Sequence, residues 1–106
     1  MTQNKPIVII CDVNTSQARA PLAFEAVIAA LRKAGPKWQT IEHIDESVQA
    51  RYVGLLAGDE MIFAARLAKA VWIANGPYCM VELTIGEAGL DGYPSSEARS
   101  YTFNRN

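Results

Sequence analysis

The first apolar segment of the chain, from Ile7 to Val13, predicts a β-strand. Apolar side chains stand on both sides of an extended chain here, with Ile7, Ile9, Cys11 and Val13 on one side and Val8 and Ile10 on the other. Such a strand is buried on both faces, so it belongs in the middle of a sheet. We therefore expect a central strand with a cover on each face of the sheet.

The next segment has the spacing of an amphipathic helix. Its apolar residues recur at helical intervals along one stripe, which consists of Phe24, Val27, Ile28 and Leu31. Because proline is tolerated in the first turn of a helix, Pro21 places the start at residues 18–20. Gly35 and Pro36 predict its end.

A second helix is expected from Glu60 to Ala74, because Gly58-Asp59 can cap its start and Asn75-Gly76-Pro77 can end it. This helix is apolar nearly all round, since Phe63, Leu67, Ala70 and Ile73 form a second apolar face beside the first. A helix of this kind is usually covered on more than one side. We predict that Phe63, Leu67 and Ile73 contact another copy or a partner. Exposed apolar residues without a function are the alternative.

Four further segments, 38–44, 48–56, 78–85 and 97–103, predict strands. Segment 48–56 also has the spacing of a short helix, but its β-branched and aromatic content favours a hairpin partner of the preceding strand. The last strand follows a loop of about ten residues, which is longer than a hairpin needs. It therefore reaches either a distant edge of the sheet or a neighbouring subunit, where Tyr101 and Phe103 would contact the partner.

The order strand, helix, strand, strand, helix, strand, followed by a terminal strand, predicts an α+β fold. It is the order of a ferredoxin-like βαββαβ sandwich with an additional C-terminal strand, formed by residues 1–106 as a single domain. Both helices then cover one face of an antiparallel sheet. We expect the sheets of two copies in a homodimer to pair face to face and cover the other.

Composition narrows the classes of function. The 106 residues include ten Lys and Arg and eleven Asp and Glu, for a net charge of −1, so no overall basic field favours nucleic acid or an anionic membrane. Nucleic acid would need a local basic patch. Cys11 and Cys79 fall in predicted strands, as buried thiols in a reducing compartment do. Without a long apolar segment or a signal-peptide pattern, the chain is expected to be cytoplasmic.

Asp12 is the first candidate for chemistry. A carboxylate at the end of a central strand can hold Mg²⁺, and a two-fold axis would bring a second Asp12 to the same cation. Such a pair supports hydrolysis of a phosphodiester bond by a metal-activated water. Alternatively, Asp12 accepts hydrogen bonds from the backbone of residues 14–17, as aspartate does in many turns. No cofactor is expected apart from Mg²⁺ in the first case.

The segment Ile7–Asn14, followed by an amphipathic helix and a second strand with a tryptophan, resembles the opening of a known family. This is the small CRISPR-associated ferredoxin-like nuclease and integration-scaffold family, and the segment is also similar to related toxin–antitoxin ribonucleases of that fold. The resemblance implies a homodimer, a metal-linked role for Asp12, and residues 97–103 as a strand that joins the partner's sheet. The chain departs from the family in lacking an obvious basic surface.

Two other groups of residues have both a functional and a structural interpretation. His43, the single histidine, lies among carboxylates, which suits Zn²⁺ binding or acid–base chemistry but also a surface strand that enters an acidic turn. A second group combines cations and aromatic rings, as sites for single-stranded nucleic acid do. It consists of Arg32, Lys37, Trp38, Arg51 and Tyr52. A helix end and a solvated sheet edge need the same residue types.

Two functions of different classes follow. One is a non-catalytic, self-associating interaction module, such as a regulator, an inhibitor or an immunity-type protein. It explains the apolar second helix, the balanced charge and the scarcity of polar clusters. The other is a Mg²⁺-dependent nuclease for RNA or DNA, with Asp12 as metal ligand in a homodimer. We favour the first because a fold does not by itself determine chemistry.

Overall fold

The structure is a computed structural model that describes residues 6–14, 23–56, 58–75, 79–89, 91–95 and 97–105. Its elements follow the order β1 (Ile7–Asn14), α1 (Phe24–Ala34), β2 (Thr40–Ile44), β3 (Ser47–Gly54), α2 (Glu60–Asn75), β4 (Cys79–Glu87) and β5 (Arg99–Arg105). Segment 48–56 therefore falls largely in a strand, as predicted, and not in a helix. The expected start of the first helix, at residues 18–20, lies outside the described residues.

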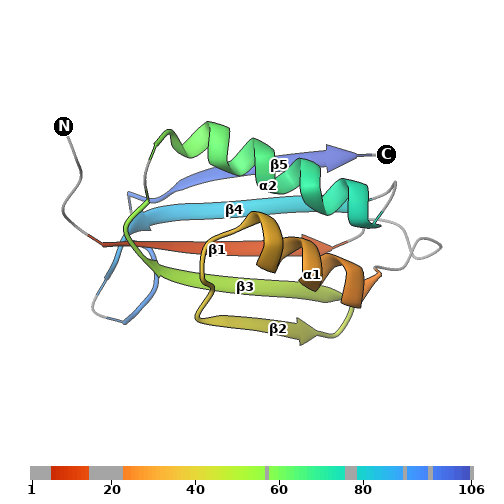
Figure 1. Cartoon of the computed structure of the whole chain (residues 1–106). Helices are drawn as coiled ribbons and strands as arrows, with labels where there is room; N and C mark the ends of the chain where they lie inside the picture. The colour runs from red at the N-terminus through yellow and green to blue at the C-terminus, as the bar shows by residue number, and fades with distance from the viewer. Residues whose placement is uncertain are drawn as a thin grey trace.

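The five strands form one antiparallel sheet in the order β2-β3-β1-β4-β5. β1 lies in the middle of this sheet, so the prediction from its two-sided apolar pattern is confirmed. β5 lies at an edge of the sheet, but it pairs with β4, the strand directly before it in the chain, and not at the distant edge that the length of the loop led us to expect. Both helices cover the same face (Figure 1). The fold is thus α+β and is compatible with a ferredoxin-like sandwich.

The core lies between the helices and the sheet. α1 contributes Val27 and Leu31, α2 contributes Leu67 and Val71, and β1 contributes Ile9, all without exposed surface. Among the described residues, no polar or charged side chain is buried. Leu67 therefore belongs to the core of its own chain and does not offer a contact surface, because α2 presses this position onto the sheet. No described helix is long and apolar enough to cross a membrane.

One end of the helix-free face is covered by the connection between β4 and β5. Val8 points to this face and has no exposed surface, and its neighbour in β4 is Gly86. A Cβ atom on Gly86 would lie 2.9 Å from the Cβ of Ala98 and 3.3 Å from the Cβ of Pro94. The connection thus packs directly on the sheet beside Val8. At this position the chain itself supplies the cover that we expected from a second copy.

The same connection also contacts the neighbouring strand, β3. The guanidinium of Arg51 lies 5.8 Å from the centre of the Tyr93 ring, within reach of a cation–π interaction. At its start, the N–H of Ala88 donates to the carbonyl oxygen of Pro6 at 3.2 Å. The unusual length of the loop is therefore used to fold back over the sheet (Figure 1). Beyond it, Ile10 is only half-buried.

Candidate functional site

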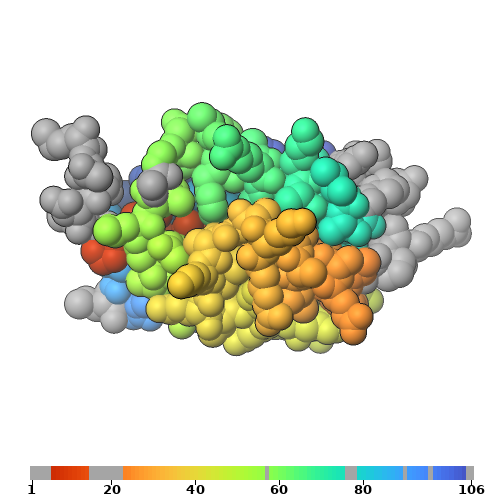
Figure 2. All heavy atoms as spheres, viewed as in Figure 1, coloured from red at the N-terminus to blue at the C-terminus, as the bar shows by residue number. Residues whose placement is uncertain are grey.

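A groove lies between α1 and α2 on the outer side of the helix layer, where the two helices meet in the space-filling view (Figure 2). Its volume is about 560 Å³. The groove is lined by Ala26, Ala29, Ala30, Lys33 and Ala34 of α1 and by Ala70, Ile73 and Ala74 of α2. Seven of these eight residues are apolar, and six are alanine, so their short side chains leave room between the helices.

Ile73 is the most exposed large apolar residue of this groove. Its exposed fraction is 72%, and Met61 and Ile62 at the other end of α2 are also more than half exposed. Phe63, in contrast, is half-buried against the core. The predicted second apolar side of α2 is therefore divided: Leu67 is in the core, Phe63 is on its margin, and Ile73 is open to solvent.

Tyr101 and Phe103 of β5 face the helices and are half-buried there. The Tyr101 hydroxyl donates to Glu60 Oε2 at 3.2 Å, and the ring of Phe103 meets Trp72 edge to face at 6.2 Å between centroids. Both side chains thus hold β5 against α2 of the same chain. Most of the surface of these two side chains is therefore buried within their own chain.

Exposed cations are found on the two helices that form the groove. Lys33 lines it, and Arg32, Arg66 and Lys69 are exposed on the same two helices. These helices carry two carboxylates. Glu25 lies in the first turn of α1. Glu60 is paired with Arg99 of β5, whose Nε donates to Glu60 Oε2 at 2.7 Å. The helix layer therefore carries an excess of positive charge.

The helix-free face carries the opposite charge. Asp12 lies inside β1, with Gln49 of β3 opposite it on one side and Glu82 of β4 on the other. Glu42 of β2 follows beside Gln49. Residues directly opposite in neighbouring strands point to the same face with Cβ atoms about 5 Å apart, so Asp12 and Glu82 are adjacent. This row of Glu42, Gln49, Asp12 and Glu82 is the carboxylate row.

Asp12 differs from its predicted setting in two ways. It stands two residues before the end of β1 instead of at the end, because Val13 and Asn14 continue the pairing with β4. Its Oδ1 accepts a hydrogen bond of 3.2 Å from Nδ2 of Asn14. The alternative donors at residues 15–17 lie outside the described residues. In the described part of the chain, no group of three or more His, Cys, Asp or Glu is placed to hold a metal ion.

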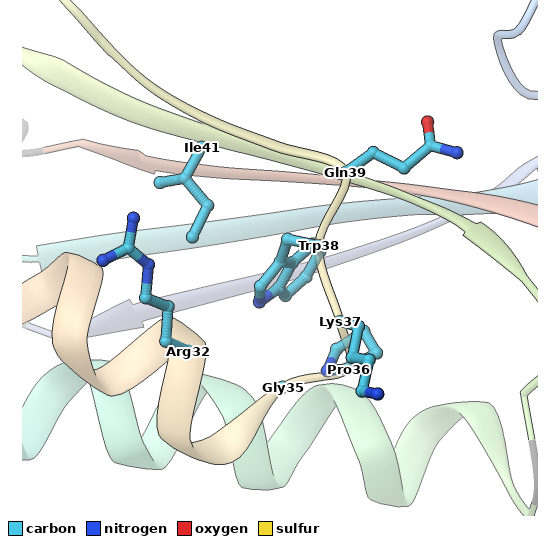
Figure 3. Close-up of a pocket in the computed structure, with 7 residues that line it drawn as sticks. All are labelled: Arg32, Gly35, Pro36, Lys37, Trp38, Gln39 and Ile41. Carbon is cyan, nitrogen blue, oxygen red and sulfur yellow. The ribbon is translucent and has the colours of Figure 1, made fainter.

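The predicted cluster of cations and aromatic rings is only partly assembled. Arg32, Lys37 and Trp38 come together with Ile41 around a pocket of about 440 Å³ (Figure 3). The indole Nε1 of Trp38 donates to the carbonyl oxygen of Leu31 at 2.8 Å, which fixes the ring against the end of α1. Figure 3 shows this ring between Arg32 and Gln39.

Arg51 and Tyr52 do not belong to that pocket. They are consecutive in β3, so they point to opposite faces of the sheet. Arg51 lies on the helix-free face against Tyr93, and its Nε is buried without a hydrogen-bond partner among the described residues. Tyr52 faces the helices, and its hydroxyl donates to the carbonyl oxygen of Leu55 at 2.7 Å. Both side chains stabilise loops of this chain.

His43 and the two cysteines have structural surroundings. The His43 ring lies 3.6 Å from the Phe24 ring between centroids, and its Nε2 donates to the carbonyl oxygen of Asp45 at 2.8 Å. Cys11 and Cys79 are buried free thiols. Burial raises the pKa of Cys79 to about 11 and raises the pKa of Cys11 further. Both are therefore protonated at neutral pH, which is typical of unreactive cysteines.

Sequence reasoning missed two features of these surfaces. Glu82 is adjacent to Asp12 only because of the register between β1 and β4, although its place on the polar side of its strand is visible in the sequence. The groove is built from alanines, which are too small to mark an apolar stripe. Comparisons with family models, with curated proteins and with solved structures find no match to this chain.

Proposed function

We propose that the chain is a small non-catalytic interaction module, of the regulator, inhibitor or immunity type, that binds a protein through its helix layer. The observation that carries this proposal is the groove between α1 and α2, with Ile73 72% exposed at its side. A large aliphatic side chain in contact with water beside an apolar groove gains free energy when another molecule covers it.

We also propose that the fold is the ferredoxin-like βαββαβ sandwich with β5 added. In this arrangement each helix connects two strands that run in the same direction with one strand between them. The strand order supports it, because β3 lies between β1 and β2, and β1 lies between β3 and β4. β5 then extends the sheet at the edge formed by β4.

Self-association is one form of this function, and the two faces of the molecule favour it unequally. Two copies that pair through their helix-free faces bring two carboxylate rows together, and Asp12 and Glu82 of each copy then repel those of the other. A homodimer through that face needs a cation between the rows. The helix layer offers apolar surface, so it is the better contact surface.

Site-specific photocrosslinking in the source cells tests the interaction. A photoreactive amino acid at position 73 is expected to give one discrete protein adduct, because Ile73 lies at the groove. The same amino acid at position 102 is the matched control, since Thr102 is exposed on β5 and points to the helix-free face. Equal adducts at both positions, or none at position 73, would contradict the proposal.

The Mg²⁺-dependent nuclease is a second candidate, and one observation favours it. Glu82 stands directly opposite Asp12, so a pair of carboxylates is available within one chain. Mg²⁺ is commonly bound by one or two carboxylates with several waters, one of which can act as the nucleophile. The carboxylate row supplies no cation for phosphate, however, and this places the nuclease second.

Cleavage assays on single-stranded RNA and on double-stranded DNA with Mg²⁺ test this candidate. If the parent protein cleaves, Asp12→Asn and Glu82→Gln are expected to abolish the activity. Glu42→Gln is the control, because its neighbour across the strand pair is Gln49 and not a carboxylate. A parent protein that cleaves neither substrate removes the candidate.

A further inference from the structure

We propose that the groove between α1 and α2 binds an amphipathic helix of another protein, with acidic residues along the margins of its apolar stripe. This inference rests on the proposed function and specifies its partner. Three features of the molecule support it: the shape of the groove, the charges beside it, and the repulsion that a second copy would meet there.

The shape of the groove suits a helix. Its lining on α1 extends from Ala26 to Ala34, and these eight steps correspond to about 12 Å, or roughly two helical turns. Helices pack at axial distances of about 8–10 Å, and small residues allow the closest approach. A third helix can therefore lie against both α1 and α2, with Ile73 in contact with its apolar stripe.

The charges beside the groove select the partner. Lys33 is part of the lining on α1. On α2, the exposed Arg66 and Lys69 precede Ala70 and Ile73 of the lining by four residues, so they lie one turn away on the same side of the helix. Cations thus stand on both helices that border the groove. By the same spacing the exposed Glu25, four residues before Ala29, is also beside it, so three cations face one carboxylate among the described residues of the two helices. Glutamate or aspartate at the margins of a bound helix would pair with them, whereas lysine or arginine would be repelled.

A second copy of this chain is a poorer occupant. An isologous contact between two helix layers places Lys33, Arg66 and Lys69 of one copy near the same residues of the other. Packing of the helix layer on the carboxylate row of the next copy matches the charges, but this head-to-tail contact is not self-complementary, so it produces rings or filaments and not a dimer. A separate acidic helix meets the same cations without either penalty.

A displayed library of helical peptides tests the proposal. Each peptide has about 18 residues, apolar residues at helical spacing, and a random choice of Glu, Gln or Lys at the positions that flank the stripe. Selection on the parent protein is expected to enrich Glu at the flanking positions. Calorimetry then measures the affinity of the best peptide.

Matched variants locate the binding site. Replacement of both Lys33 and Lys69 by Glu is expected to weaken the best peptide about tenfold at low salt, because two attractive pairs become repulsive. Lys37→Glu carries the same chemical change outside the groove and is expected to leave the affinity unchanged. Ala29→Trp fills the groove from an exposed position and is expected to abolish binding. Circular dichroism confirms that each variant is folded.

Several outcomes overturn the inference. The first is a selection that enriches Lys, or that shows no preference among Glu, Gln and Lys at the flanking positions. The second is a selection that yields no binding peptide. The third is a selected peptide that binds Ala29→Trp with the same affinity as the parent. A parent dimer that Ala29→Trp dissociates would make a second copy the occupant, and the proposed function would still stand. If position 73 also gives no crosslinked adduct in cells, the proposed function fails with the inference.

Discussion

Gly86→Ala tests how the β4–β5 connection covers the helix-free face. An added Cβ would lie 2.9 Å from the Ala98 Cβ, 3.0 Å from the Ala98 Cα and 3.3 Å from the Pro94 Cβ. Overpacking of this kind costs about 2 kcal/mol, whereas alanine is favoured over glycine in a strand by about 0.5–1 kcal/mol. The expected net effect is a loss of about 1 kcal/mol in the free energy of unfolding.

Urea unfolding measures this loss, and a double-mutant cycle identifies its cause. Ala98→Gly removes the nearest atom, so in the Gly86→Ala background it is expected to restore at least about 0.5 kcal/mol relative to its effect in the parent. Hydrogen exchange of the Ala88 and Ser95 amides should quicken in Gly86→Ala, because both amides belong to the displaced connection and donate hydrogen bonds, Ala88 to Pro6 and Ser95 to Glu87. A Gly86→Ala protein more stable than the parent would refute the packing of this connection on the sheet.

Three further predictions concern pH, an ion pair and an aromatic contact. Because burial raises the pKa of Cys79 from 9.0 to about 11, the unfolded chain loses this proton first as pH rises. The parent should therefore lose about 2 kcal/mol more stability than Cys79→Ala between about pH 8 and pH 10.5 in alkaline urea titrations. Glu60→Gln breaks the exposed pair with Arg99 and should cost about 1 kcal/mol or less, with a smaller loss at high salt. Phe103→Leu should cost about 1 kcal/mol in thermal unfolding, since it removes the edge-to-face contact with Trp72.

Most elements of the fold follow from local spacing. Apolar residues on both sides of β1 identify it as the central strand, and the stripe through Leu31 identifies α1. The choice between strand and helix for segment 48–56 is closer, because both periods fit. It is settled by long-range contacts: once β3 pairs with β1, Val48 and Ala50 are buried in the core between the sheet and the helices. Such long-range contacts cannot be identified from the spacing of residues within a short segment of the sequence.

The candidate sites are predicted less well, for the same reason. Arg32, Lys37 and Trp38 are near one another in the chain, and the structure brings them together. Arg51 is separated from them by β2, and its place on the other face of the sheet follows from the register. The overall charge of −1 also conceals a separation of charge, because the helices bear cations while carboxylates are arranged in a row on the sheet.

The carboxylate row should lower the stability of the folded protein, because two of its carboxylates are adjacent. Like charges directly opposite in neighbouring strands destabilise a sheet by up to about 1 kcal/mol, and Asp12 and Glu82 form such a pair. Glu82→Gln should therefore raise the free energy of unfolding by about 0.5 kcal/mol at low salt, with a smaller gain at high salt. Glu42→Gln, whose neighbour is Gln49, should change it little.

Magnesium distinguishes a tolerated repulsion from a binding site. If the pair holds Mg²⁺, the cation stabilises the folded parent by mass action and raises its melting temperature, whereas Glu82→Gln loses most of this response. Suppose that Mg²⁺ does not change the melting temperature of the parent and that Glu82→Gln is more stable than the parent. The repulsion between Asp12 and Glu82 is then not offset by a metal, and this result further favours the helix layer as the functional surface. If Glu82→Gln instead lowers stability, or acts no differently from Glu42→Gln, the adjacency of Asp12 and Glu82 derived from the register of β1 and β4 is refuted.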